Sequence, residues 1–367
     1  MRILVFIPSL GYGGAEITII NLSNYFDSLG HNVTILTMLK TTKRVDGLNK
    51  NIKVIEMDNE TLNLGVTRKV VNFILRIYKL QMKVRSINPD VSLSFLTEAN
   101  TIFLCSNLFS QRKIIINERT NPKLHKPSLF YRFLRYLLYR LATILVVQTD
   151  EIKKLCQKFV KDSNVRVIPN FVRDEFFETT RIHSENKSVD YCVGFIGRLS
   201  KEKRVSDLIS SFVLVIKTFP NARLVVTGDG LEKENLRNLV MKLKLTNHVI
   251  IEDARSNVKE AFSKISIFVL PSAYEGFSNV LLEAMASRVA ILTTCEGGSY
   301  LIDHQDCGLL FDAGDVNQLA RGICYLLQNP EIMKNFAENA NIKVQSFSKA
   351  AILPIWGTLV EEIANGS

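Results

Sequence analysis

The sequence is poor in the features that mark several protein classes. Its six cysteines form no Cys-x-x-Cys pair and lack metal-ligand spacing, so we expect reduced thiols of a cytoplasmic protein and no metal module. No apolar run approaches the roughly 18–20 residues that a membrane-spanning helix needs. The apolar opening segment, Arg2–Ile7, is short and ends at Pro8-Ser9 without a small-residue cleavage site, so no signal peptide is expected.

The charge of the chain is divided unevenly between its halves. The chain has 367 residues, 47% of them hydrophobic and 22% charged, a length and composition that predict two globular domains. Residues 1–180 hold 26 Lys and Arg against 15 Asp and Glu, whereas residues 181–367 hold 20 against 21. We therefore expect the first half to meet an anionic partner, such as a membrane surface, a phosphorylated substrate or nucleic acid.

Short β-rich runs alternate with longer segments of helical period in both halves, which predicts right-handed crossovers and parallel sheets. Residues 173–188 are polar and lack apolar periodicity, and the strand–helix pattern restarts after them. We predict an α/β fold of two Rossmann-like domains, residues 1–172 and 189–345. A linker over 173–188 joins them, and a helical segment over 346–367 follows.

A glycine-rich turn at Gly11, Gly13 and Gly14 follows the first predicted strand and opens a helix. Backbone amides at such a turn, with the helix dipole, favour a bound phosphate, although a plain strand–helix connection has the same pattern. The spacing is not the Gly-x-Gly-x-x-Gly of dinucleotide-binding proteins, and no acidic residue ends the second strand at Thr37. A nicotinamide cofactor is therefore disfavoured, and no cofactor is expected.

Two loops of the second half carry stronger signals. In the first, Gly197 allows a close backbone approach, and Arg198 and Lys203 are able to converge on a diphosphate. In the second, Glu275 lies in a loop and Glu283 lies two turns into the helix that follows. Both loops follow predicted strands, at the edge where open α/β sheets bind ligands.

The start of this last helix suits an anion. Its amides at Ser278, Asn279 and Val280 are expected to face a diphosphate, because a helix N-terminus favours negative charge. Glu283 is then placed to accept hydrogen bonds from a ribose diol, and Glu275 from a sugar hydroxyl. A single glutamate is more often a surface charge, but two that bracket a helix start favour a binding role.

The Glu-x7-Glu pattern, preceded by Gly-Arg-Leu-x-x-x-Lys (Gly197–Lys203) and by Gly-Gly-Ala-Glu (Gly13–Glu16), resembles the retaining glycosyltransferases of family 4. These motifs are spread over nearly the whole chain. The resemblance implies the two-domain GT-B fold, with a nucleotide-sugar on the second domain, the acceptor on the first and a cleft between them. It also implies that the last helix crosses back to the first domain.

On this resemblance Glu275, Arg198 and Lys203 form the catalytic group. Glu275 lies beside the donor sugar, and the two cations clamp the diphosphate without a metal. Consistent with this, the chain has no Asp-x-Asp sequence. Retention is expected by front-face attack, since no second carboxylate is evident on the opposite face. The expected donor-binding residues are Gly14, Gly197, Arg198, Lys203, Ser278, Asn279, Val280 and Glu283.

The first half departs from the family where many members carry a histidine after the fourth strand, since this chain has none in Ser94–Asn100. That segment and the Glu-Arg-x-Asn-Pro element at Glu118–Pro122 are similar to a subgroup of bacterial surface-polysaccharide and lipid-linked oligosaccharide assembly, which transfers hexoses or N-acetylhexosamines. The acceptor-side candidates are therefore Thr97, Glu98, Glu118 and Arg119. For Glu98 and Glu118 a structural role at a strand end stays open. Two positions that are usually glycine are Arg204 and Ser278.

The segment Phe130–Leu141 predicts a cationic, aromatic amphipathic helix. At 100° per residue Arg132, Arg135 and Arg140 share an arc with two tyrosines, opposite Phe133, Leu134, Leu137 and Leu141. Such a helix suits an anionic membrane interface, whereas a core-packed helix with solvated arginines is the alternative. We expect peripheral binding on the inner face of the cytoplasmic membrane, next to a lipid-diphosphate-linked or saccharide acceptor.

The predicted function is transfer of a hexose or N-acetylhexosamine, with a UDP-linked donor favoured. A GT-B nucleotide-sugar epimerase or hydrolase is the alternative, but the five histidines fall mostly in predicted loops. A nucleic-acid-binding protein would need stacking aromatics or a recognised module, and neither is evident. The sequence leaves the sugar, the acceptor, the linkage and the oligomeric state open.

Overall fold

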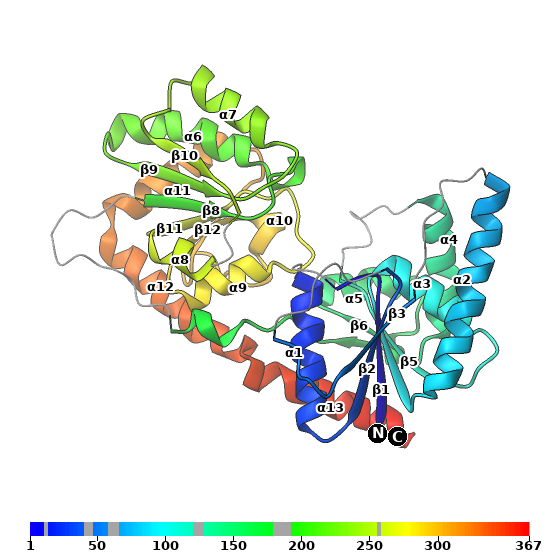
Figure 1. Cartoon of the computed structure of the whole chain (residues 1–367). Coiled ribbons are helices and arrows are strands. Elements are labelled where there is room, and N and C mark those ends of the chain that lie inside the picture. The colour runs from blue at the N-terminus through cyan, green and yellow to red at the C-terminus, as the bar shows by residue number, and fades with distance from the viewer. Residues whose placement is uncertain are drawn as a thin grey trace. The chain divides into compact units, whose positions relative to one another are not determined.

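The computed structural model describes residues 1–10, 14–39, 47–57, 66–119, 128–178, 192–254 and 258–366. They form two compact units, each with its own sheet (Figure 1). Unit 1 comprises Met1–Asn170 and Ile352–Ser367, and unit 2 comprises Phe171–Ala351. None of the described helices is both long and apolar enough to cross a bilayer.

Unit 1 is built on a seven-stranded parallel sheet with the order β3-β2-β1-β4-β5-β6-β7. The order reverses between β1 and β4, which is the switch point of a Rossmann-like sheet. The strands are β1 (Arg2–Ile7), β2 (Asn32–Thr37), β3 (Lys53–Glu56), β4 (Val91–Phe95), β5 (Lys113–Asn117), β6 (Ile144–Val147) and β7 (Val165–Val167). The helices are α1 (Gly14–Ser28), α2 (Val66–Ile87), α3 (Thr97–Ser106), α4 (Leu129–Leu138) and α5 (Asp150–Cys156).

Unit 2 repeats this architecture with six parallel strands in the order β10-β9-β8-β11-β12-β13, and its order reverses between β8 and β11. The strands are β8 (Cys192–Ile196), β9 (Arg223–Thr227), β10 (Val249–Glu252), β11 (Ile267–Leu270), β12 (Ala290–Thr294) and β13 (Leu309–Phe311). The helices are α6 (Val205–Thr218), α7 (Lys233–Lys242), α8 (Val258–Ser263), α9 (Asn279–Ala286), α10 (Cys295–Gly298), α11 (Val316–Gln328) and α12 (Pro330–Val344). The predicted α/β class with two Rossmann-like sheets is confirmed.

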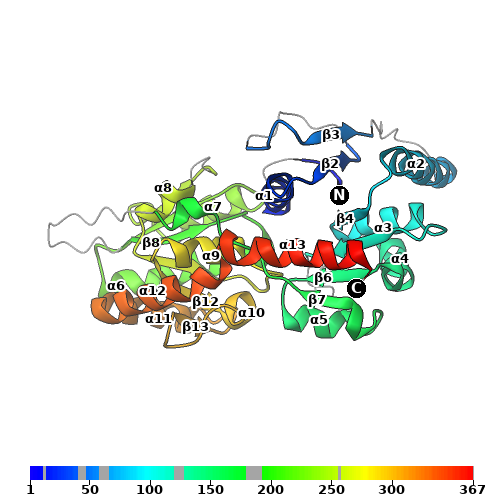
Figure 2. The same cartoon turned by 90° about the horizontal axis from the view of Figure 1, so that it is seen from below.

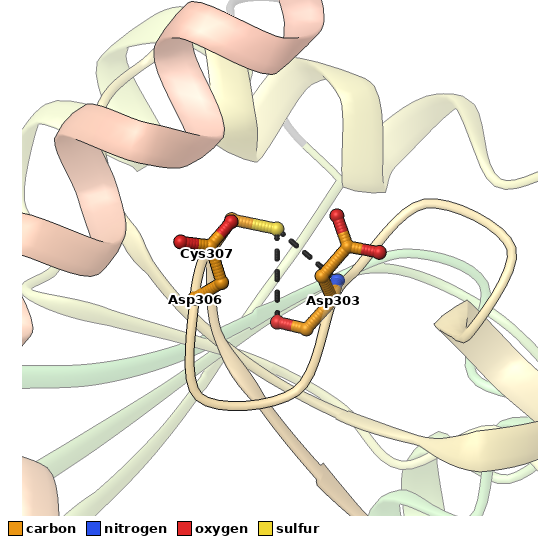
Figure 3. A group of neighbouring side chains, drawn as sticks. All are labelled: Asp303, Asp306 and Cys307. Carbon is orange, nitrogen blue, oxygen red and sulfur yellow. Dashed lines mark hydrogen bonds between the residues drawn. The ribbon is translucent and has the colours of Figure 1, made fainter.

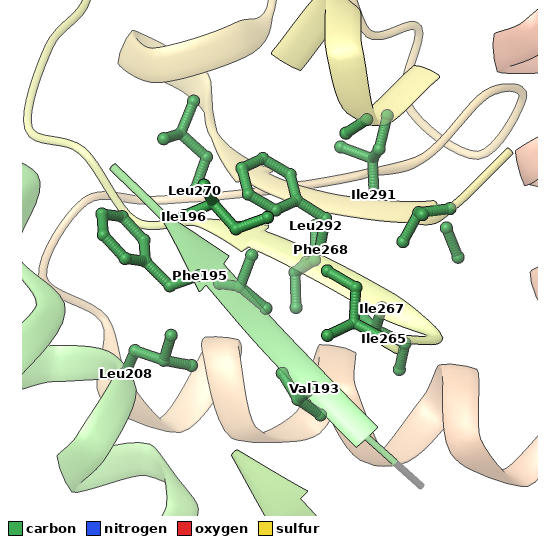
Figure 4. Packing of buried hydrophobic residues seen from close by; sticks show 14 of the residues in the cluster. Val193, Phe195, Ile196, Leu208, Ile265, Ile267, Phe268, Leu270, Ile291 and Leu292 are labelled. Carbon is green, nitrogen blue, oxygen red and sulfur yellow. The ribbon is translucent and has the colours of Figure 1, made fainter. Parts of the chain in front are cut away.

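The central strands of unit 2 are apolar on both faces because helices cover both sides of the sheet. Phe195 of β8 is fully buried on the side of the sheet where Leu208 of α6 lies (Figure 4). Phe268 of β11 is fully buried on the other face, with its ring 5.6 Å from that of Phe262 in α8. A continuous apolar run is what such a doubly covered strand requires. This core holds the strand ends, and therefore the loops that follow them, in fixed positions.

The last helix, α13 (Lys349–Asn365), begins in unit 2, and from Ile352 onward it belongs to unit 1 (Figure 2). There the Trp356 ring lies 6.2 Å from the Phe95 ring, and Lys113 Nζ donates a hydrogen bond of 2.6 Å to the Ala364 carbonyl. The only tryptophan of the chain therefore serves as an anchor for this helix, buried to 2% exposure.

The linker predicted over 173–188 is misplaced at its start. The segment from Phe171 already belongs to unit 2, where Phe176 is fully buried with its ring 5.9 Å from that of Phe262. The Val172 amide donates to the Phe347 carbonyl, which ties this segment to the 3₁₀ turn that follows α12. Because the residues around Phe176 are mostly polar, the sequence did not predict that this aromatic side chain anchors the segment in unit 2. Residues 179–191 lie outside the described part of the chain.

Candidate functional site

The loops after β8 and β11 meet at the switch point of unit 2. The β8 loop runs from Gly197 into a short 3₁₀ turn at Lys201–Lys203, and the β11 loop runs from Pro271 to Ser278. The Ala273 amide donates to the Glu202 carbonyl at 2.8 Å and joins the two loops. This junction brings together the residues that the two sequence motifs supply.

The β8 loop approaches its neighbour so closely that glycine is required. Gly197 has φ +156°, and a Cβ placed on Gly228 would come within 1.9 Å of the Gly197 carbonyl oxygen. The Leu199 amide donates to the Asp229 carbonyl across the same contact. The loop is thereby fixed against the end of β9, and Arg198 is left exposed at its tip.

Lys203 and Glu275 pair directly. Lys203 Nζ lies 2.5 Å from Glu275 Oε1, and Ser272 Oγ donates to the same oxygen at 2.7 Å. The two charged side chains are only 18% and 12% exposed, so water screens their attraction weakly. The expected diphosphate ligand and the expected sugar-side carboxylate thus occupy one cluster.

Glu283 has a partner that the sequence did not reveal. Arg173 Nη2 lies 3.0 Å from Glu283 Oε1, and the guanidinium also stacks over the Phe176 ring, 4.7 Å from its centroid. Burial raises the pKa of Glu283 to about 7, and Arg173 opposes that rise. Arg173 was part of the predicted linker, and no motif near it signals a contact with a residue 110 positions away.

The N-terminus of α9 is not as free as predicted. The Ser278 amide donates a 2.6 Å hydrogen bond to the Tyr300 hydroxyl, so this amide already has an acceptor, and its contact with a diphosphate stays a prediction. Burial is the main cause that raises the pKa of Tyr300, and the negative charge of Glu275 raises it further. Asn279 and Val280 are the first two residues of the helix, and their placement at its start agrees with the prediction.

In unit 1, Gly14 and Arg119 lie after the carboxyl ends of β1 and β5. Gly14 is the exposed first residue of α1, whereas Gly11 and Gly13 lie outside the described residues. Arg119, which follows β5, donates to Thr18 Oγ1 at 3.1 Å and to Asn170 Oδ1 at 2.5 Å. Burial lowers the pKa of Arg119 to about 10, which leaves the guanidinium positively charged at neutral pH.

Two of the acceptor-side candidates point inward. Thr97 Oγ1 donates to the Glu118 carboxylate at 2.9 Å, and Tyr139 donates to it at 2.8 Å. Thr97 is 3% exposed and Glu118 is fully buried, so both belong to an internal network at the ends of β4 and β5. The expected position of Thr97 facing an acceptor is thereby corrected, and Glu118 has the structural role at a strand end that the sequence left open. Glu98 remains exposed on the first turn of α3.

The predicted faces of the amphipathic helix are also corrected. The α-helix ends at Leu138, and Arg135 turns inward with Leu138 and Tyr139, its guanidinium 5.9 Å from the centroid of the Phe159 ring. The outward side chains are instead largely apolar. They are Leu129, Phe130, Phe133, Tyr136 and Leu137, with Arg132 and Arg140 at their margins.

One group of described residues has the composition of a metal site: Asp303, Asp306 and Cys307 (Figure 3). Its ligand atoms are already engaged. The Asp303 carboxylate pairs with Lys343, Asp306 accepts from Asn339, and the Cys307 sulfur accepts from the Asp303 amide at 3.2 Å. Burial raises the pKa of Cys307 and favours the neutral thiol. These contacts fit a closed turn better than a metal centre.

Two Rossmann-like sheets, with cations and carboxylates at the switch point of the second, agree with the architecture of the GT-B class of glycosyltransferases. Comparison of the sequence with protein families agrees. Residues 12–176 match the family described as Glycosyltransferase Family 4, and residues 176–343 match Glycosyl transferases group 1. The chain belongs to the family 4 glycosyltransferases, enzymes that take a glycosyl group from a nucleotide-sugar.

Relatives and solved structures extend this result. The chain is 29% identical over 61% of its length to an uncharacterized glycosyltransferase of Methanocaldococcus jannaschii, and the match spans 60% of that protein. It is 27% identical over 75% of its length to a Campylobacter jejuni N-acetylgalactosamine-N,N'-diacetylbacillosaminyl-diphospho-undecaprenol 4-alpha-N-acetylgalactosaminyltransferase, covering 77% of it. A sucrose-phosphate synthase from Thermosynechococcus elongatus shares the fold, with a TM-score of 0.85 at 17% identity over 100% of both chains.

Proposed function

We propose that this chain transfers a hexose or N-acetylhexosamine from a UDP-sugar to a lipid-diphosphate-linked or saccharide acceptor, with retention of configuration and without a metal. The observation that carries the proposal is the cluster at the switch point of unit 2. Within it Lys203 pairs with Glu275, and the mostly buried Glu283 pairs with Arg173. Unit 2 is accordingly proposed to bind the donor and unit 1 the acceptor.

The cluster supplies the charges that such a transfer needs. As the bond between sugar and diphosphate breaks, negative charge grows on the leaving phosphate, and Arg198 and Lys203 are the cations placed to stabilise it. Glu275 is placed beside Lys203, where a carboxylate favours the positive charge that develops on the sugar ring. With these groups the leaving phosphate itself takes the acceptor proton, as front-face attack requires.

The names of relatives support the class of acceptor. Two Campylobacter jejuni relatives are N-acetylgalactosaminyltransferases named for undecaprenol diphosphate-linked acceptors. Arg119 offers a charged guanidinium at the strand ends of unit 1, where a diphosphate or a saccharide hydroxyl is a suitable partner. The exposed Glu98 is the second side chain that we propose for the acceptor side.

A second surface of unit 1 supports contact with a membrane. Helices α2 and α4 lie together, with the Phe73 and Phe130 rings 5.3 Å apart. Exposed basic residues border an apolar patch there, the composition of an interfacial anchor on anionic lipid. We call it the α2–α4 surface; its apolar members are Ile74, Leu75, Tyr78, Met82, Leu129, Phe130, Phe133, Tyr136 and Leu137, and its basic members are Lys79, Lys83, Arg85, Arg132 and Arg140.

The described histidines do not support an epimerase or hydrolase. His31 precedes β2, His248 precedes β10 and His304 precedes β13, so all three lie toward the amino ends of strands. The switch-point loops lie at the opposite, carboxyl edge. His304 Nδ1 accepts from the Leu310 amide, and His248 Nδ1 lies 3.2 Å from the Ala222 carbonyl oxygen. Both rings have local structural partners.

Thermal unfolding with UDP, GDP and ADP tests the donor, since a ligand at about 100 times its Kd adds about 2.7 kcal/mol of stability. We expect the largest shift in Tm with UDP. Radiolabelled UDP-sugars are then incubated with polyprenyl-diphosphate-linked saccharides after treatment with EDTA. Transfer with the anomeric configuration of the donor supports the proposal. A larger shift with GDP, free sugar as the product, or loss of activity in EDTA would each contradict one part of it.

A further inference from the structure

We propose that Arg173 is a positioning residue for the donor ribose: it favours the ionised form of the Glu283 carboxylate and orients it for the ribose hydroxyls. The inference rests on the proposed function, because it takes Glu283 as the ribose ligand. It adds a residue outside the motifs, from the segment between the two sheets.

The geometry of Arg173 suits this task. Its guanidinium is held at three points: Nη1 lies 2.7 Å from Glu175 Oε1, Nη2 lies 3.0 Å from Glu283 Oε1, and the plane lies over the Phe176 ring. Phe176 is fully buried, so the surface on which the guanidinium stacks is fixed. Because Arg173 contacts Glu283 through Oε1, Oε2 is the oxygen that it leaves for a further donor.

The protonation of Glu283 determines what it is able to bind. An ionised carboxylate accepts hydrogen bonds from both hydroxyls of a diol, whereas a protonated carboxyl loses part of that capacity. The side chain is 14% exposed, and its burial raises its pKa to about 7 even with Arg173 beside it. Without the nearby positive charge the pKa would rise further, and the acid would be largely neutral at pH 7.

Few other charges face Glu283 among the described residues. Glu175 raises its pKa, and Asp174 is paired with Lys349. Strand β12 carries no titratable side chain, and α12 reaches α9 through Asn341, whose amide donates to the Ala286 carbonyl. Arg173 is therefore the cation that governs this carboxylate. Its Nε donor is buried and has no acceptor among the described residues, so Glu175 is the other carboxylate that its guanidinium pairs with.

The experiment compares the affinity of the full chain for UDP and for 2′,3′-dideoxy-UDP between pH 6 and pH 9. The affinity for UDP divided by that for 2′,3′-dideoxy-UDP measures the contribution of the ribose hydroxyls, because titration of the phosphates affects both nucleotides alike. For the unchanged chain we expect the ratio to fall as the pH drops below about 7. For Arg173→Gln we expect the fall to begin at higher pH. A rise of about one pKa unit would make the ratio about fivefold smaller at pH 7, with recovery by pH 9.

Two variants and a control complete the test. Arg173→Lys keeps the positive charge and should retain most of the ratio. Arg237→Gln removes an exposed arginine from α7, paired with Glu234, and should change nothing. A ratio for Arg173→Gln that equals that of the unchanged chain, or that is reduced equally at every pH, overturns the positioning role. If Glu283→Ala leaves the ratio intact, the ribose assignment in the proposed function fails instead.

Discussion

Lys203 and Glu275 neutralise each other across the two switch-point loops of unit 2, with Nζ and Oε1 2.5 Å apart. One was expected at the donor diphosphate and the other at the donor sugar. At the proposed donor site, a diphosphate would compete with Glu275 for the ammonium group. Binding of the leaving group and release of the carboxylate toward the sugar would then be coupled through this one contact.

Glu275→Gln should separate binding from turnover. Removal of the negative charge leaves Lys203 available for the diphosphate, so UDP affinity should rise by about three- to tenfold. Transfer should fall by about 100-fold or more, because the amide does not stabilise positive charge on the sugar. Calorimetric titration with UDP and initial rates with a UDP-sugar measure the two effects. Weaker UDP binding together with unchanged turnover would disprove the assigned role.

Glu232→Gln is the matched control for that variant. Glu232 is the residue directly before α7. It has no contact with Lys203 or Glu275 in the described hydrogen bonds and ion pairs. We expect its UDP affinity and turnover to match those of the unchanged chain. An equal change in both variants would point to a general effect of charge on this unit.

Tyr300→Phe should destabilise unit 2 by about 1–2 kcal/mol. The substitution removes the hydroxyl that accepts from the Ser278 amide at 2.6 Å, and an amide left without an acceptor in a buried position is costly. Denaturant unfolding measures the change. Tyr325→Phe, on a side chain 43% exposed, is the control and should stay within about 0.5 kcal/mol. Equal midpoints for the two variants would show that water or another group replaces the hydroxyl without loss.

Local patterns in the sequence were sufficient to predict the fold and the positions of the switch-point loops. Apolar runs such as Arg2–Ile7 specify doubly covered strands, and the loop motifs follow those strands directly, so chain order alone places Lys203 near Glu275. Arg173 and Tyr300 were missed for a different reason. Their partners lie far away in sequence, and an arginine or tyrosine in a loop has no periodic pattern that indicates its contact.

The orientation of α4 shows a second limit of sequence patterns. Helical periodicity separates two faces but does not state which face covers the sheet. The three arginines were expected to share one face, as in a helix at a membrane interface, with a core-packed helix and solvated arginines as the alternative. In the structure Arg135 is 8% exposed and packs near Phe159, while Phe133 faces outward. Tertiary contacts of that kind determine which face of α4 is buried, and the local sequence pattern does not indicate them.

Arg204 occupies a left-handed conformation that usually belongs to glycine, with φ 49°. Replacement by glycine removes the steric cost of that conformation but also the ion pair between Arg204 Nε and Asp207 Oδ2. We expect Arg204→Gly to change the free energy of unfolding by less than about 1 kcal/mol. Arg204→Val should lower it by more than about 1 kcal/mol, because a β-branched side chain tolerates this φ poorly. Denaturant midpoints of the two variants give the comparison, and a more stable valine variant would refute it.

Replacement of two outward aromatics tests the α2–α4 surface. Phe133 and Tyr136 are 64% and 60% exposed, so Phe133→Ser with Tyr136→Ser should leave the Tm nearly unchanged. Sedimentation with vesicles of phosphatidylglycerol should show binding at least about tenfold weaker, because apolar area leaves the lipid interface. Leu231→Ser with Met241→Ser removes exposed apolar side chains from unit 2, 97% and 58% exposed, and should bind vesicles as the unchanged chain does. Equal vesicle binding by both double variants would place the membrane contact elsewhere.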